Sequence, residues 1–200
     1  MNYFTIKNLS IGNYSKGGSV FKAIAVSTES LKKVKIEFSK LKQEYTDATH
    51  ISYAYRIITN NNLNEYSTDS GEPNGSAGLP ILNILKSNKL VNIVVFVIRY
   101  YGGNKLGITG LIQSYSNAAN DCLLNSILIK YKIYRNLHIV YDYKLDKRIL
   151  QLIKIYNAKI IQQNYSEIVD LYLKLDENDF NIVVDKLKTI SNNKIKIKYK

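Results

Sequence analysis

Glycine and proline are confined to the first 110 of the 200 residues. Seven of the ten glycines and both prolines fall between Gly71 and Gly110, and the last 90 residues contain neither type. Glycine permits positive φ angles and close backbone approach, so special backbone geometry must be concentrated in two short segments. The rest of the chain must be built from regular helices and strands joined by ordinary turns.

Apolar periodicity predicts an α/β domain over residues 1–130. Apolar side chains at steps of three and four over residues 31–45 are typical of a helix. Residues 50–58 alternate, which predicts a strand with Tyr53 on one face and Arg56 on the other. The apolar run at 93–98 predicts a central strand that is covered on both faces. We also expect strands at 3–9 and 20–27, a loop at 60–64, and helices around 81–85 and 111–122.

A second domain is expected over residues 135–200, joined to the first by a short linker. Its apolar patterns predict strands at 137–143, 158–165, 168–175 and 194–200, and helices at 145–156 and 180–190. The order βαββαβ is that of a ferredoxin-like split βαβ domain. The whole chain is therefore expected to be α+β. Tyr53, Tyr55, Tyr141 and Tyr143 are expected to face the core.

The composition bears on the cellular compartment of the protein and on the disulfide, metal and membrane-spanning features it can have. A single cysteine excludes a disulfide scaffold and any multi-cysteine zinc site. The longest apolar run, 90–98, is too short to cross a membrane and is interrupted by Asn92. We expect a cytoplasmic protein with no membrane contact, no bound metal and no cofactor.

The net charge favours a polyanionic partner, nucleic acid first. The chain has 28 Lys and Arg against 16 Asp and Glu, which gives +12. Only four of the basic residues are arginine, and Asn, Ile and Tyr are abundant. Because AT-rich codons supply Lys, Asn, Ile and Tyr together, genome base composition is the alternative explanation of the excess.

Two Gly-rich segments, 69–80 and 99–110, lead into predicted helices. A strand, a Gly-rich turn and a helix N-terminus present backbone N–H groups to an anion, and Arg99 and Lys105 would add charge. The spacing matches neither a Walker A loop nor a dinucleotide-binding fingerprint. The backbone N–H groups and the two cations, rather than a known motif, predict that these segments form a cradle for a phosphate group. The alternative is that the glycines allow tight turns, with Asp69 or Glu72 paired to Arg99 or Lys105.

The stretches 47–56, 69–82 and 99–119 (DATHISYAYR, DSGEPNGSAGLPIL and RYYGGNKLGITGLIQSYSNAA) closely resemble the signatures of the Impact family, specifically its bacterial YigZ-type branch. The resemblance implies an N-terminal domain with the fold of elongation factor G domain IV and a C-terminal ferredoxin-like domain like its domain V. Eukaryotic relatives regulate translation. For the bacterial branch a role in RNA or ribosome binding has been suggested.

The matching positions divide into two expected roles. Those expected to contact an anion or nucleic acid are His50, Arg56, Arg99, Tyr100, Gly102, Gly103, Lys105, Gly107 and Gly110. Those expected to shape the loops are Asp69, Gly71, Glu72, Pro73, Gly75, Gly78 and Pro80. Leu79 and Gln113 stand where arginines are common in the family, which weakens the predicted grip on phosphate.

Outside the Gly-rich segments, the signals for a catalytic site or a second phosphate-binding site are weak. His50 and Ser52 share a strand face about 7 Å apart, too far for direct activation of a nucleophile. His138 is expected to be solvated beside Asp142, and Cys122 to lie in the core. The lysines of 194–200 are expected either to contact phosphate or to protect an edge strand.

We therefore expect a non-enzymatic binding protein that contacts RNA, the ribosome or a translation-regulatory protein. A small enzyme acting on a phosphorylated metabolite or nucleotide through the same loops is the first alternative. A protein–protein adaptor is the second. The sequence assigns no oligomeric state.

Overall fold

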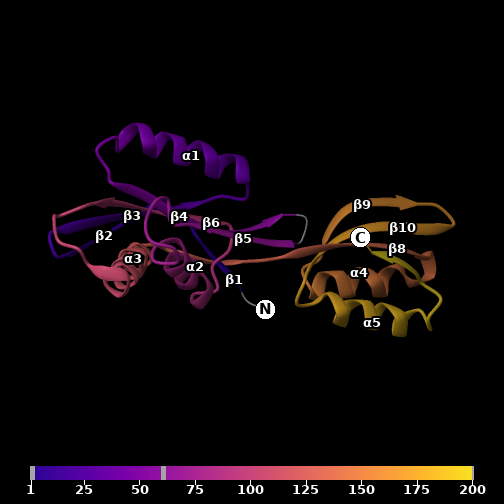
Figure 1. Ribbon diagram of the computed structural model, residues 1–200. Helices are drawn as coiled ribbons and strands as arrows, with labels where there is room; N and C mark the ends of the chain where they lie inside the picture. The colour runs from indigo at the N-terminus through magenta and orange to yellow at the C-terminus, as the bar shows by residue number, and fades with distance from the viewer. Residues whose placement is uncertain (1–2, 60–61, 200) are drawn as a thin grey trace. The chain divides into compact units, whose positions relative to one another are not determined.

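A computed structural model describes residues 3–59 and 62–199 (Figure 1). The chain forms two compact units, whose boundary in the sequence lies between Tyr131 and Lys132. The α+β class is confirmed, since both units combine strands and helices. No helix within the described residues is long and apolar enough to span a membrane.

The first unit is built on a five-stranded antiparallel sheet. Its strands are β2 (Ser10–Lys16), β3 (Ser19–Ser27), β4 (His50–Thr59), β5 (Asn62–Thr68) and β6 (Ile93–Tyr100). They lie in the order β2-β3-β6-β4-β5. The predicted central strand is confirmed, because β6 lies in the middle of the sheet and its apolar residues are buried.

Helices cover both faces of this sheet (Figure 1). Helix α1 (Leu31–Glu44) packs on one face, while α2 (Gly78–Ser87) and α3 (Gly107–Leu124) pack on the other. The three layers explain why β6 reads as a continuous apolar run although its neighbours are antiparallel. Two cores result, one on each side of the sheet.

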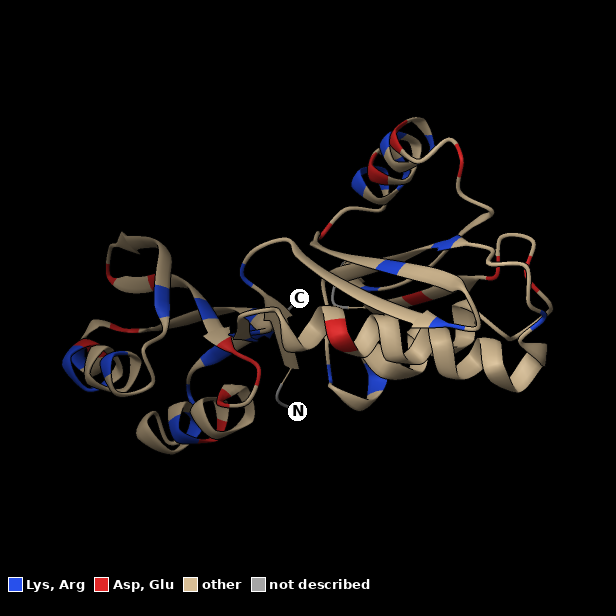
Figure 2. Ribbon diagram, turned by 90° about the vertical axis from the view of Figure 1, so that its left-hand side faces the viewer, with Lys and Arg blue, Asp and Glu red and all other residues tan. Residues whose placement is uncertain are grey.

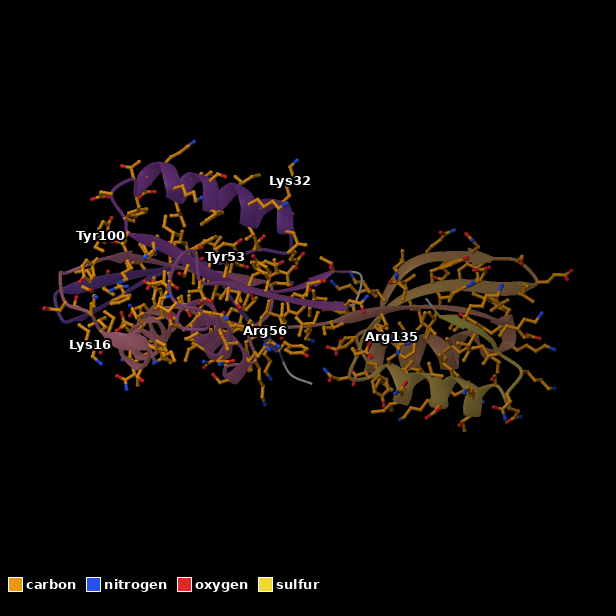
Figure 3. The ribbon with its side chains drawn as sticks, in the orientation of Figure 1. Lys16, Lys32, Tyr53, Arg56, Tyr100 and Arg135 are labelled. Carbon is orange, nitrogen blue, oxygen red and sulfur yellow. The ribbon has the colours of Figure 1, made fainter. Side chains whose placement is uncertain are left out.

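The predicted alternation along β4 is confirmed. The ring of Tyr53 lies 5.0 Å from that of Phe38 on α1, measured between centroids. Arg56 points to the opposite face, where its Nη1 donates to the carbonyl of Leu90 at 2.8 Å (Figure 3). Strand β4 therefore contributes side chains to both layers.

Three strands were missed by the sequence patterns: β2, β5 and a short strand β7 (Leu128–Tyr131). β7 pairs with β1 (Tyr3–Ile6), so the two ends of the first unit meet. The loop prediction for 60–64 was wrong at 62–64, which belong to β5, and residues 60 and 61 lie outside the described residues. These strands carry little apolar alternation, so sheet pairing rather than local pattern defines them.

The second unit has the predicted ferredoxin-like order of elements. These are β8 (Tyr134–Asp142), a short 3-10 turn (Tyr143–Leu145), α4 (Asp146–Ile155), β9 (Lys159–Tyr165), β10 (Ile168–Asp176), α5 (Phe180–Ile190) and β11 (Lys196–Tyr199). The sheet order is β11-β8-β10-β9, and helices α4 and α5 cover one face of this sheet (Figure 1). Tyr141 faces the core as expected, whereas Tyr143 is exposed, which corrects that prediction.

Candidate functional site

A buried ion pair joins the two Gly-rich segments. Arg99, at the end of β6, donates from Nη1 to Glu72 Oε1 at 2.6 Å, and only 7% and 2% of the two side chains are exposed. Tyr115 of α3 donates its hydroxyl to the same carboxylate oxygen at 2.7 Å. The Arg99 guanidinium also lies over the rings of Phe21 and Tyr101, 5.5 and 5.4 Å from their centroids. One carboxylate thus holds both segments together.

The Tyr115 hydroxyl is a permanent donor in this network. Burial raises its pKa well above the ordinary value for tyrosine, and the charge of Glu72 raises that pKa further. The phenol therefore remains protonated and keeps its bond to Glu72. Burying a carboxylate is costly unless it is paired and hydrogen-bonded, and Arg99 and Tyr115 supply both conditions.

Arg56 and Arg99, which were both expected to contact a bound anion, are buried and donate to groups of this chain. The Nε of Arg56 donates to Glu65 at 2.8 Å, and its Nη1 donates to the carbonyls of Leu90 and Leu85. A buried guanidinium needs acceptors, and this chain supplies several from its own carboxylates and carbonyls, although Arg99 Nε has no acceptor within the described residues. For Arg99, the pairing with Glu72 is the one foreseen in the alternative interpretation of the Gly-rich segments.

Asp69 occupies the amides that the first Gly-rich segment offers. Its carboxylate accepts from the backbone N–H groups of Gly75, Ala77 and Gly78 at 2.8, 2.9 and 2.8 Å. These donors include the first turn of α2, so Asp69 satisfies the positive end of that helix. The Asp69 carboxylate therefore occupies the amides that an external phosphate would need at the first segment.

His50 and Ser52 support the same segment from β4. The Nδ1 of His50 lies 3.0 Å from the carbonyl oxygen of Ser70, and Ser52 Oγ donates to the carbonyl of Asp69 at 2.7 Å. Both side chains thus bind backbone rather than each other. This geometry fixes the turn at 69–71 against the sheet.

The other residues expected to shape the loop lie in the turn after β5 and in the first turn of α2. The carbonyl of Pro73 accepts from Ser76 N at 3.0 Å and from Ser76 Oγ at 2.6 Å. Pro80 is buried in the first turn of α2. Gly71 and Gly75 lie within the turn that joins Asp69 to that helix.

The second Gly-rich segment is held by the β2–β3 turn. A Cβ on Gly102 would lie 1.9 Å from the carbonyl carbon of Gly18, so only glycine fits there. The backbone N–H of Gly102 donates to Ser19 Oγ at 3.1 Å, and Asn104 Nδ2 donates to the carbonyl of Gly17 at 3.2 Å. The loop is therefore anchored at its start and in its middle.

Beyond these anchors the loop is open. Gly103, Lys105 and Gly107 are exposed, and Gly107 begins α3 with no side chain capping the helix. Lys105 makes no hydrogen bond or ion pair within the described parts of the chain. The predicted Tyr100 faces elsewhere, with its hydroxyl 3.4 Å from Asp47 Oδ1, and Gly110 is buried in α3. The exposed groups here are a lysine ammonium and the first amides of an 18-residue helix.

A separate cleft of about 620 Å³ lies between α1 and the β4–β5 side of the sheet. The aromatic side chains of Phe38, Tyr53 and Tyr66 line it together with Lys42 and His50. The rings of Tyr53 and Tyr66 lie 5.8 Å apart between centroids. Of the predicted site residues, only His50 borders this cleft.

Comparison with known proteins defines the family. A family model described as the Impact N-terminal domain matches residues 17–123. The chain belongs to the Impact family. Its member YvyE from Bacillus subtilis is 30% identical over 98% of this chain and 90% of its own length. YigZ from Escherichia coli is 31% identical over 52% of this chain and 52% of its own length.

Solved structures support the fold. A crystal structure described as a hypothetical protein superposes with a TM-score of 0.65 at 23% identity, over 98% of this chain and 96% of that one. A protein from Thermus thermophilus superposes with a TM-score of 0.54 at 9% identity, and this chain corresponds to 28% of its length. At these identities the likeness concerns the fold alone.

The Impact N-terminal domain contains the whole Glu72 network, since all its members fall within 17–123. Apolar spacing over 111–122 predicts this helix but gives no sign that the Tyr115 hydroxyl bonds to Glu72. Cys122 is buried as predicted, and burial raises the pKa of its thiol. Residues 3–59 and 62–199 contain no group of three or more His, Cys, Asp or Glu side chains that could hold a metal ion.

The prediction for His138, which lies outside the matched domain, needs a correction. His138 was expected to be solvated beside Asp142, but its Nε2 lies 2.9 Å from Asp170 Oδ1 and its ring stacks on Tyr172. The alternation of 137–143 and 168–175 could have placed both rings on one sheet face. Their pairing required the register between β8 and β10.

Proposed function

We propose that this Impact-family chain is a non-enzymatic binding protein linked to translation, and that it contacts RNA phosphates at the loop before α3. The single observation that carries the proposal is the contrast between Lys105 and the arginines. Lys105 and the start of α3 are exposed and uncapped, whereas Arg56 and Arg99 are bound internally.

The physical basis is electrostatic. The first N–H groups of a helix lack intrahelical partners, and the helix dipole adds partial positive charge at that end. A phosphate satisfies both, and the ammonium of Lys105 adds a full charge beside them. The net charge of +12 draws a polyanion to the chain from a distance. Figure 2 shows Lys and Arg spread over both units among Asp and Glu, so the net charge supplies long-range attraction while the α3 loop supplies the local contact.

A non-enzymatic role is supported by the internal bonds that the carboxylates of the Gly-rich segments make. Glu72 is occupied by Arg99 and Tyr115, and Asp69 by backbone amides. These bonds stabilise the loops and engage both carboxylates as structural acceptors, so neither serves as a free base for a nucleophile. The link to translation rests on the family resemblance, in which eukaryotic relatives regulate translation.

The test is RNA binding as a function of salt. We expect affinity to fall steeply with ionic strength, because phosphate contacts release counterions. Lys105→Ala should weaken binding several-fold and reduce the slope of log affinity against log salt by about one. Lys32→Ala is the matched control, since Lys32 is an exposed lysine of α1 (Figure 3) and should leave the slope unchanged. A salt-independent affinity, or equal effects of both substitutions, would contradict the proposal.

A second candidate function is binding of a nucleotide in the aromatic cleft beside α1. The cleft volume of about 620 Å³ suits a small molecule, and Tyr53, Tyr66 and Lys42 offer stacking surfaces and a cation. Thermal unfolding in the presence of individual nucleotides tests it. A rise in Tm with one nucleotide, abolished by Tyr66→Ala, would favour this candidate over phosphate contact at Lys105.

A further inference from the structure

The second unit has one sheet face covered by helices and an opposite face that its own elements leave open (Figure 1). Alternation along the strands places Leu137 and Leu173 under α4 and α5, in the core. It places His138, Tyr172 and Lys198 on the open face, where they occur as register neighbours. Aromatic side chains on this open face leave apolar ring surface in contact with solvent, where it is available to a ligand.

The centre of this face is a stacked ring pair. His138 of β8 and Tyr172 of β10 have centroids 4.1 Å apart and planes within 4° of parallel. β8 and β10 are the two central strands of the sheet. Asp170 holds the imidazole at 2.9 Å, so the ring orientation is set from the strand itself. The pair is a rigid aromatic platform in the middle of the face.

The platform borders a cavity with both apolar and polar lining residues. Both rings line a cavity of about 450 Å³, together with Ile161, Gln162 and Lys198. Tyr172 is 36% exposed and Ile161 is 58% exposed. The cavity thus offers a ring surface, an aliphatic wall and a side-chain amide. A flat ligand with apolar faces and hydrogen-bonding edges matches this set, and a nucleobase has those properties.

Cations border the same face. Lys198 pairs in register with His138, Lys196 with Val140, and Lys174 with Asn136. The nearest carboxylate, Asp170, is engaged by His138. A ligand that carries both bases and phosphates therefore complements the face better than an apolar peptide does.

We propose that the open face of the C-terminal sheet binds single-stranded RNA by stacking a base on the His138–Tyr172 pair. Aromatic residues on the two central strands of a four-stranded βαββαβ sheet are the arrangement by which RNA-recognition motifs stack bases. Duplex RNA keeps its bases paired and cannot offer a face to the rings. Lys174, Lys196 and Lys198 contact the phosphates on either side of the stacked base.

This inference rests on the proposed function for the class of ligand, but it uses different residues and a different interaction. Base stacking depends on Tyr172 and is detected by quenching of a base fluorophore, whereas phosphate contact at the α3 loop depends on Lys105 and is detected by the Lys105→Ala change in salt slope. The two surfaces can therefore be tested separately in the full chain.

The experiment measures binding of a short single-stranded RNA that contains 2-aminopurine to the full-length protein. We expect wild type to quench the fluorophore, and Tyr172→Ala to lower affinity about tenfold and remove the quenching. Tyr172→Phe should keep both, because it preserves the ring. Tyr165→Ala is the control, since Tyr165 is an exposed tyrosine of β9 that does not line the cavity. Lys198→Glu, an exposed position, should weaken binding without threatening the fold.

The outcomes separate the two proposals. Quenching that is lost in Tyr172→Ala but kept in Lys105→Ala supports the stacking face. RNA binding with a steep salt dependence but no quenching, or equal competition by duplex RNA, overturns the stacking face and leaves the α3-loop proposal standing. Absence of RNA binding by wild type at low salt overturns both.

Discussion

The Gly-rich region of the first unit and the open sheet face of the second use their polar residues in opposite ways. Around Glu72 the ionisable side chains are buried and bound to one another. Around Tyr172 the aromatic and cationic side chains are partly exposed, and Asp170 pairs with His138. The region richest in sequence motifs is thus the one in which the most charge is used for structure.

This difference shows that a motif with Arg, Glu and Gly need not mark a ligand site by its charged residues. In the Gly-rich region of the first unit the charges hold two loops in place, and the groups left open at the start of α3 are backbone amides and Lys105. In the second unit no motif marks the face, yet the platform is accessible. The following substitutions test whether the two regions differ in this way.

The largest effect is expected for the buried carboxylate. Glu72→Gln removes one charge with little change of shape and leaves Arg99 buried without a counter-ion, which should cost about 3 kcal/mol of unfolding free energy. Asp170→Asn is the matched change on the open face and should cost less than about 1 kcal/mol. Urea denaturation of both variants measures the difference. Equal losses would remove the distinction between the two regions.

A smaller effect is expected from the glycines of the second loop. Gly102→Ala places a Cβ against the backbone of Gly18 and should cost about 2 kcal/mol or more, because the β2–β3 turn must move. Gly103→Ala meets no atom within 4 Å but has φ +88°, so its cost should be about 1 kcal/mol. Thermal unfolding of the two variants tests the order. The reverse order would show that the β2–β3 turn yields easily.

The smallest effect concerns Glu65, the partner of Arg56, which lies on the exposed strand β5. Burial raises the pKa of Glu65, but hydrogen bonds and charge from Lys86 and Arg56 outweigh it, so the pKa lies below the ordinary value of 4.5. The unfolded chain therefore binds this proton more tightly, and stability is lost as the pH falls through 4.5 and below.

Glu65→Gln should consequently reduce the unfolding free energy by about 1 kcal/mol at neutral pH. The gap between wild type and variant should close once the solution is well below pH 4, because Glu65 is then protonated in wild type. Urea midpoints measured across this range test the sign. A gap that persists in acid would mean that the shape of the side chain, rather than its charge, matters.

Much of the fold could be predicted from local pattern. The helix at 31–45, the central strand at 93–98 and the βαββαβ order follow from periodicity, because apolar spacing records which face each element buries. The strands at 10–16 and 62–68 could not be predicted, because β5 is largely exposed and its partner β4 defines it.

The amino-acid sequence was sufficient to locate the special backbone, to order the elements and to indicate the Impact family. It left open whether Asp69 or Glu72 would pair with Arg99, since either carboxylate could reach it. Folding settled that choice by bringing Glu72 and Tyr115 to one buried point from segments 43 residues apart. Likewise the His138–Tyr172 stack depends on the register of β8 and β10, which is a property of the sheet. Local spacing determines which face of an element a side chain occupies, but only three-dimensional proximity determines its partner. Burial then decides whether a charged side chain stabilises the fold or stays open to a ligand.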